Sequence, residues 1–228
     1  MKTTRTKPLK IRTERSGFVD GIATVPAQAD TAYVFAHGAG AGMTHPFMVA
    51  VAEGLAQRRI ATLRYQFPYM QAGKRRVDSP AVSHEAVRAA VARARTLWPS
   101  LPLFAGGKSF GGRMTSQAQA FAPLPAVIGL IFLGFPLHPA GKPSVERAAH
   151  LATIDVPMLF IHGSRDALAH AVQFRRMTSQ LGAFASRVEI PGSDHTFHVP
   201  RRTGRTDREV LDDILDGVTV WTQAWRLD

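Results

Sequence analysis

The chain has 228 residues, of which 45% are hydrophobic and 20% are charged, and this is the composition of one globular domain with a substantial core. It contains no cysteine, which excludes disulfides, thiolate catalysis and cysteine metal sites. The formal net charge of +11 would attract nucleic acid or acidic lipids non-specifically, but the 28 lysines and arginines are spread along the chain without one long basic block.

No nucleic-acid-binding motif accompanies these charges, so we expect no specific nucleic-acid partner. The basic N-terminal segment lacks the apolar core of a secretory signal. The longest apolar run, residues 126–137, is interrupted by two glycines and a proline and is too short to span a bilayer. We therefore expect a cytoplasmic protein with no membrane partner, in which residues 1–228 form one domain and residues 1–6 form a flexible tail. The oligomeric state is left open.

Short apolar runs alternate with amphipathic segments along the chain. Residues 7–13 and 18–25 predict a β-hairpin with its turn at Gly17. The later runs are short and apolar on both faces, which is typical of buried parallel strands. These runs are residues 32–36, 60–65, 103–105, 127–133, 158–161 and 187–190.

Helices are predicted where apolar residues recur with helical spacing or where a capping motif opens the segment. Pro46 and Ser79-Pro80 each begin such a segment, residues 114–121 form another, and a capping box at residues 206–209 opens the last. Residues 66–77 are predicted as a loop. The alternation predicts an α/β fold, with a mostly parallel twisted sheet of about seven to eight strands and helices on both faces.

The segment after residues 103–105 carries the strongest functional signal. Residues 107–111 (Gly-Lys-Ser-Phe-Gly) match G-x-S-x-G, a strand-turn-helix motif that exposes a serine nucleophile at a sharp bend. In a chain with 19 glycines the same pentapeptide can also arise as a plain strand-to-helix turn. A phosphate-binding loop ending in Gly-Lys-Ser would need glycine where Pro102 stands, which disfavours that alternative.

Partners for Ser109 follow from the rule that sites in such sheets lie at the carboxyl ends of the strands. Asp166 comes directly after residues 158–161, whereas Asp155 precedes them. His195 comes directly after the last predicted strand. The chain order Ser109, Asp166, His195 is the order expected of a Ser-Asp-His triad on an α/β sheet.

A loop of small residues, His37 to Gly40, follows the strand at residues 32–36. It does not fit the G-x-G-x-x-G dinucleotide pattern, but an H-G-x-G loop at this place can supply an oxyanion-binding N–H group. We expect the backbone N–H groups of Ala39 and Phe110 to form an oxyanion hole. His37 either fixes this loop by hydrogen bonding or has a packing role.

Residues 106–113 (GGKSFGGR), 37–40 (HGAG) and 192–195 (GSDH) make the chain resemble the α/β-hydrolase superfamily. It is similar to a short, lidless, dienelactone-hydrolase-like group that also includes hydrolase-like subunits of a eukaryotic histone-acetyltransferase complex. The resemblance covers about residues 17–225 and implies an α/β-hydrolase fold. Phe110 stands where the group would have methionine, which should not affect a backbone interaction.

True dienelactone hydrolases use a cysteine nucleophile, which this chain lacks, so their particular substrate is not implied. Between the strand at residues 127–133 and the next helix, only residues 134–143 are available, so we expect no substantial lid and an open site. Four apolar residues could line an acyl pocket or serve ordinary packing. They are Met43, Phe67, Met70 and Phe135.

These features predict a serine hydrolase that cleaves a small ester or thioester through an acyl-enzyme intermediate. Ser109 would be the nucleophile, His195 the general base and Asp166 the group that orients the histidine. We expect no cofactor and no metal, since His195 and His198 lack a third ligand with suitable spacing. The alternative is a catalytically silent scaffold of the same fold, because fold does not fix function. Peptidase and acyltransferase chemistry stay open.

Overall fold

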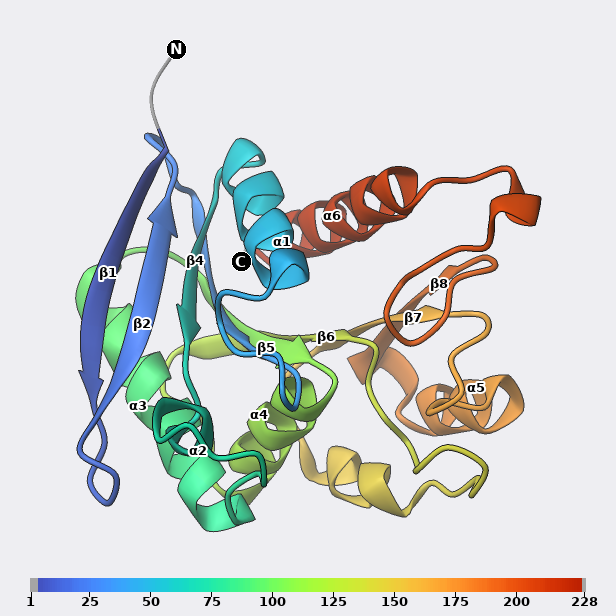
Figure 1. The fold of residues 1–228 in the computed structure, drawn as a ribbon, viewed down its shortest axis with the longest axis horizontal. Coiled ribbons are helices and arrows are strands. Elements are labelled where there is room, and N and C mark those ends of the chain that lie inside the picture. Colours follow the sequence, from blue (N-terminus) through green and yellow to red (C-terminus); the bar gives the residue numbers. More distant parts are fainter. Residues whose placement is uncertain (1–3, 227–228) are drawn as a thin grey trace.

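The computed structural model describes residues 4–226 and contains one eight-stranded sheet between layers of helices (Figure 1). The strand order is β1-β2-β4-β3-β5-β6-β7-β8. The pairs β1·β2 and β2·β4 are antiparallel, and the other pairs are parallel. The strands are β1 (Arg5–Arg12), β2 (Phe18–Val25), β3 (Thr31–Ala36), β4 (Ile60–Tyr65), β5 (Leu103–Lys108), β6 (Val127–Leu133), β7 (Met158–Gly163) and β8 (Ala185–Ile190). The predicted fold class is confirmed.

Helices cover the sheet on two sides, and each side has its own hydrophobic core. Successive side chains of β3 point to opposite faces of the sheet, so this one strand contributes to both cores. Tyr33 and Phe35 face the core under α1 and α6, whereas Val34 faces the core under α3, α4 and α5. The helices are α1 (Pro46–Gln57), α2 (Pro68–Gln71), α3 (Pro80–Leu97), α4 (Phe110–Phe121), α5 (Ala171–Gln180) and α6 (Asp207–Ala224), with 3-10 helices at Glu146–Thr153, Gly182–Phe184 and Arg201–Thr203.

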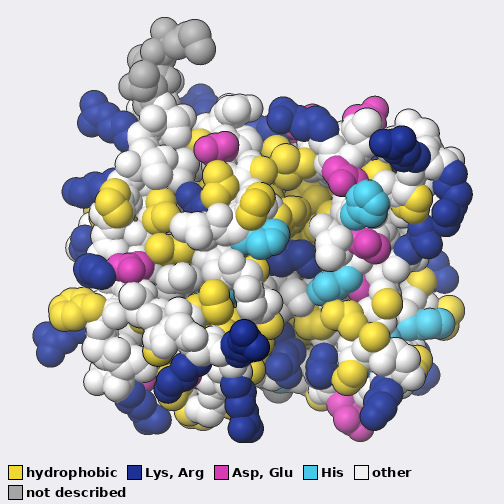
Figure 2. All heavy atoms as spheres, in the orientation of Figure 1, with side chains coloured by type: hydrophobic (Ala, Val, Ile, Leu, Met, Phe, Trp, Pro, Cys, Tyr) yellow, Lys and Arg dark blue, Asp and Glu magenta, His cyan; other side chains and the backbone are white. Residues whose placement is uncertain are grey.

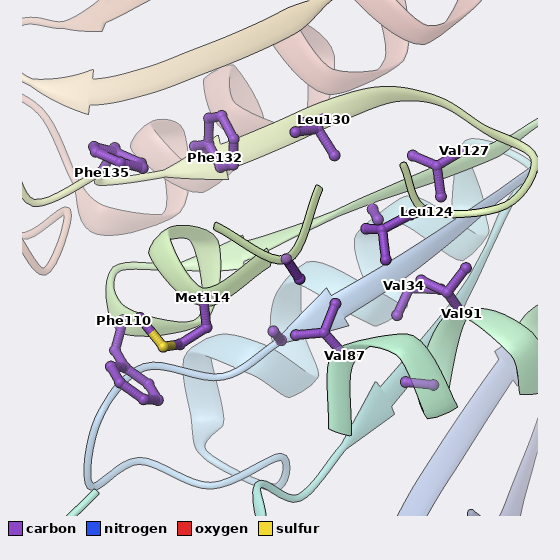
Figure 3. Packing of buried hydrophobic residues seen from close by; sticks show 14 of the residues in the cluster. Val34, Val87, Val91, Phe110, Met114, Leu124, Val127, Leu130, Phe132 and Phe135 are labelled. Atoms are coloured by element: carbon purple, nitrogen blue, oxygen red, sulfur yellow. The ribbon is translucent and has the colours of Figure 1, made fainter. Parts of the chain in front are cut away.

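Figure 3 shows the second of these cores at close range. Val87 of α3, Met114 of α4 and Phe132 of β6 belong to the same buried cluster. The rings of Phe132 and Phe135 pack edge to face, with 5.2 Å between their centroids. This cluster packs α4, the helix that follows Ser109, against the sheet.

Several boundaries differ from those expected. Arg5 and Thr6 belong to β1, so the expectation of a flexible tail is wrong for them, while residues 1–3 lie outside the described residues. The segment 66–77 contains the short helix α2, which starts at a proline. Strand β5 continues to Lys108 because its glycines still pair with β3 and β6.

Between residues 4 and 226, no helix is both long enough and apolar enough to span a bilayer.

The close approach of β5 and β6 gives a test of the fold. Gly106 has φ of +154°, and a Cβ there would overlap the carbonyl oxygen of Ile131. We expect Gly106→Ala to lower the free energy of unfolding by about 3 kcal/mol or more, because backbone rather than a flexible side chain must move. Urea unfolding measures this change.

The matched control is Gly182→Ala. Gly182 also has a positive φ, +59°, but a Cβ there would meet nothing within 4 Å. Only the conformational cost applies, about 1 kcal/mol. Equal losses in the two variants would contradict the expected clash.

Candidate active site

Ser109 occupies a sharp turn between β5 and α4. Its φ is 49° and its ψ is −112°, a strained conformation for a residue with a side chain. The turn packs against the end of β3 so tightly that a Cβ on Gly111 would lie 2.6 Å from the carbonyl oxygen of Ala36. A Cβ on Gly107 would likewise overlap this oxygen. The Ser109 N–H donates to the carbonyl oxygen of Leu133 at 3.1 Å, which ties the turn to β6.

The structure brings Ser109, His195 and Asp166 together in one hydrogen-bonded chain. His195 Nε2 lies 2.8 Å from Ser109 Oγ, and His195 Nδ1 lies 2.8 Å from Asp166 Oδ2. A carboxylate only accepts, so Nδ1 carries the proton and Nε2 is free to accept from the serine hydroxyl. The Asp166 carboxylate is fully buried, and its other oxygen accepts the Leu168 N–H at 2.8 Å. Both partners follow strands, as the sheet rule predicts.

The loop after β3 lies beside this turn and is held by its own His37 side chain and by contacts with the segment after β4. His37 is completely buried, donates from Nδ1 to the carbonyl oxygen of Gly38 at 2.8 Å and accepts the Phe67 N–H at Nε2 at 3.1 Å. The Gly40 N–H donates to the Tyr69 hydroxyl at 3.0 Å. Burial lowers the pKa of His37 to about 4, so its ring is neutral at physiological pH.

Two backbone N–H groups near Ser109 are free to donate a hydrogen bond to a ligand. Within residues 4–226, neither Ala39 nor Phe110 donates its N–H to a protein acceptor. Phe110 is the first residue of α4, so its N–H also lies at the positive end of the helix dipole. A Cβ on Gly38 would lie 3.9 Å from that of Ser109, which places the loop in contact range of the serine.

A cavity of about 310 Å³ opens over Ser109. On the face drawn in Figure 2, histidine side chains border a hollow with hydrophobic walls. Apart from Lys108 and the residues already described, the cavity is lined by side chains that the sequence did not single out for a pocket. They are Ala41, His45, Phe47, Met48, Leu168 and Thr196.

The four pocket candidates from the sequence, Met43, Phe67, Met70 and Phe135, do not line this cavity. Phe67 and Phe135 are buried in the core, so packing is their role. Apart from Lys108, the last residue of β5, the lining residues come from segments that follow β3, β5, β7 or β8. The rule that sites lie after strands could have found them, whereas apolar character alone could not.

In the described part of the chain, no group of three or more histidine, aspartate or glutamate side chains is arranged so that it could hold a metal ion. The imidazole of His198 hydrogen-bonds to the carboxylate of Asp207 at 2.9 Å.

The sheet order and a Ser-His-Asp chain at the carboxyl edge define a protein with the architecture of an α/β hydrolase. The chain belongs to the family described as Alpha/beta hydrolase domain, whose model matches residues 29–223. Known structures share this fold. A lidless α/β serine hydrolase from Xanthomonas campestris is 20% identical, with a TM-score of 0.75 and 96% of each chain covered.

A dienelactone hydrolase from Anabaena variabilis is 19% identical, with a TM-score of 0.76 over 97% of this chain and 98% of that one. An α/β serine hydrolase homologue from Coxiella burnetii is also 19% identical, with a TM-score of 0.75 over 92% and 96% of the two chains. At these identities the likeness establishes the fold.

The buried neutral His37 makes stability depend on pH. Its pKa of about 4 in the folded protein lies below the usual 6.5, so the unfolded chain binds the proton more readily. Stability is therefore lost as pH falls from 6.5 towards 4, by about 3 kcal/mol for this group. We expect wild type to lose that much more than His37→Gln across this range, measured by urea unfolding at each pH.

His170→Gln is the control, because the His170 side chain is exposed and hydrogen-bonds to no group within residues 4–226. This variant should lose stability with falling pH as wild type does. Parallel profiles for wild type and His37→Gln would show that His37 does not cause the acid sensitivity.

Proposed function

We propose that this protein is a serine hydrolase that cleaves small esters or thioesters through an acyl-enzyme intermediate. The observation that carries the proposal is the chain of two 2.8 Å hydrogen bonds from Ser109 through His195 to Asp166. Each group has the partner its role requires: the hydroxyl faces a free imidazole nitrogen, and the opposite nitrogen faces a buried carboxylate. No cofactor takes part in the proposed reaction.

In the first half of the reaction, Ser109 Oγ attacks the substrate carbonyl carbon while His195 Nε2 takes the hydroxyl proton. Asp166 stabilises the resulting imidazolium without becoming protonated. The tetrahedral intermediate expels its alkoxide or thiolate, which receives the proton from Nε2, and the acyl group stays on the serine. In the second half, His195 takes a proton from water, the hydroxide attacks the acyl carbon, and Ser109 leaves with the proton returned.

The negative oxygen of each tetrahedral intermediate would be bound by the N–H groups of Ala39 and Phe110. Both are backbone donors in fixed positions, which need no reorganisation when charge develops. One such donor is worth on the order of 3 kcal/mol of transition-state stabilisation. The contacts of His37 and Tyr69 with the loop would therefore matter to the rate through the placement of Ala39.

A small or protruding acyl group fits the site. The cavity of about 310 Å³ is at the lower end of known ligand pockets, and its walls are mainly apolar. The connection between β6 and β7 holds only a 3-10 helix, Glu146–Thr153, and no domain that would cover a long lipid tail. A cytoplasmic location stays a prediction from the sequence.

The alternative is a silent scaffold, as suggested by the resemblance to subunits of a histone-acetyltransferase complex. That link stays a prediction. A scaffold needs neither the strained serine nor the buried carboxylate, and the aligned chain of hydrogen bonds favours catalysis.

The activity is tested by intact mass after exposure to a fluorophosphonate. Such a reagent bonds only to a serine whose hydroxyl is activated by a base. We expect one adduct on wild type and none on Ser109→Ala. Ser116→Ala, at a buried serine on α4, should still give one adduct. A folded wild type that gains no adduct would make the scaffold the leading function.

Substrate size is tested with esters and thioesters of rising acyl length. We expect kcat/KM to be highest for acetyl to butyryl groups and to fall by at least tenfold at palmitoyl, because the cavity cannot bury the longer chain. A steady rise in kcat/KM up to palmitoyl would contradict a small, open site.

A further inference from the structure

Lys108 links the nucleophile's turn to the loop that carries the histidine. It is the last residue of β5 and directly precedes Ser109. Its ammonium donates to the backbone carbonyl oxygen of His195 at 2.6 Å. The same ammonium lies 5.2 Å from the ring centroid of Phe197, within the range of a cation-π contact. The Gly-Lys-Ser sequence that resembles a phosphate-binding loop thus directs its lysine towards the protein's own backbone.

The backbone of the loop at residues 194–198 makes few other hydrogen bonds, although the buried Phe197 ring stacks on Phe47 with 5.7 Å between the ring centroids. The remaining backbone hydrogen bonds of this loop are internal: the Asp194 N–H donates to the His198 carbonyl oxygen, and the Phe197 N–H donates to the Asp194 carbonyl oxygen, both at 3.0 Å. Within residues 4–226, Lys108 is the one group outside this loop that hydrogen-bonds to its backbone. This contact therefore restrains the carbonyl group of His195 directly.

The lysine is also confined. Gly134, with φ of +67°, passes so close that a Cβ there would lie 2.9 Å from the Lys108 ammonium and 3.4 Å from the His195 carbonyl oxygen. The charged and titratable groups that face the ammonium are Asp166, after β7, and Asp194 and His195 of the loop. Burial lowers the pKa of Lys108 to about 8, while the two carboxylates oppose this shift. At neutral pH the side chain is mostly charged.

We propose that Lys108 is a positioning residue, whose ammonium fixes the backbone of His195 and so holds the imidazole at hydrogen-bonding distance from Ser109. This inference rests on the proposed function for its effect on rate. A hydrogen bond from an ammonium is roughly twice as strong as a neutral one, and it acts on the peptide unit of the base itself. A displacement of about 1 Å at a reacting group can cost on the order of a hundredfold in rate.

The test compares wild type with Lys108→Met, which keeps the unbranched stem of the side chain and removes its charged donor. Lys142→Met is the matched control at an exposed lysine of the β6–β7 connection. At pH 7 we expect Lys108→Met to react with the fluorophosphonate about ten- to a hundredfold more slowly. We expect its Tm to stay close to that of wild type, because the hydrogen bond lost from the His195 carbonyl oxygen is offset by the desolvation cost that the ammonium no longer carries. Lys142→Met should match wild type in both.

The pH profile supplies a readout that a purely structural role would not change. The labelling rate of wild type should fall above about pH 8, as Lys108 loses its charge. In Lys108→Met this fall should be absent. A labelling rate within about twofold of wild type, or a slow rate accompanied by a clearly lower Tm, would overturn the proposal.

Proton NMR separates this inference from the proposed function. The downfield resonance of the His195 Nδ1 proton, bonded to Asp166, reports whether the imidazole is held, and it needs no turnover. We expect it to be sharp in wild type and in Lys142→Met, and broadened or lost in Lys108→Met. If wild type gains no adduct, the proposed hydrolase activity fails. The resonance alone then shows whether Lys108 holds the imidazole of His195. An unchanged resonance in Lys108→Met would overturn the positioning role.

Discussion

The turn from β5 into α4 packs so closely against the carboxyl end of β3 that two of its positions have no room for a Cβ atom. Gly107 and Gly111 both meet the carbonyl oxygen of Ala36 at this point. Because neither position has a side chain, the chain can turn sharply enough to hold Ser109 at a positive φ and begin α4 immediately. The same approach places the loop after β3 beside the serine. One steric constraint therefore sets the nucleophile and the donors for its transition state together.

A second close approach occurs two strands further along the sheet. A Cβ on Gly163, the last residue of β7, would lie 2.6 Å from the Asp194 carbonyl oxygen. Glycine here brings the loop that carries Asp166 against the loop that carries His195. The site thus depends on two places at the edge of the sheet where glycine allows neighbouring segments to pack closely. The hydrogen bonds of the His195 side chain to Ser109 and Asp166 join these two places directly.

The fold class and the positions of Ser109, Asp166 and His195 could be read from the sequence because each depends on local order: an apolar run followed by turn residues. Other features depend on tertiary contacts. The helix α5 was not predicted, since only Phe174, Met177 and Thr178 of its ten residues are buried and no side chain caps its first turn. The direction of Lys108 was missed because a side chain's partner across the sheet leaves no periodic signal. The walls of the cavity were missed because apolar character, rather than position after a strand, was used to choose them.

The short connection between β6 and β7 has a kinetic consequence. Enzymes that close a lid over the substrate are often limited by the opening of that lid and the release of product. Here the cavity over Ser109 opens to solvent, so the proposed reaction would need no lid to open before a product leaves. In the proposed reaction, turnover would then be set by acylation or deacylation of the serine. The two chemical steps would become directly visible in pre-steady-state kinetics, with a burst of the first product wherever deacylation is the slower step.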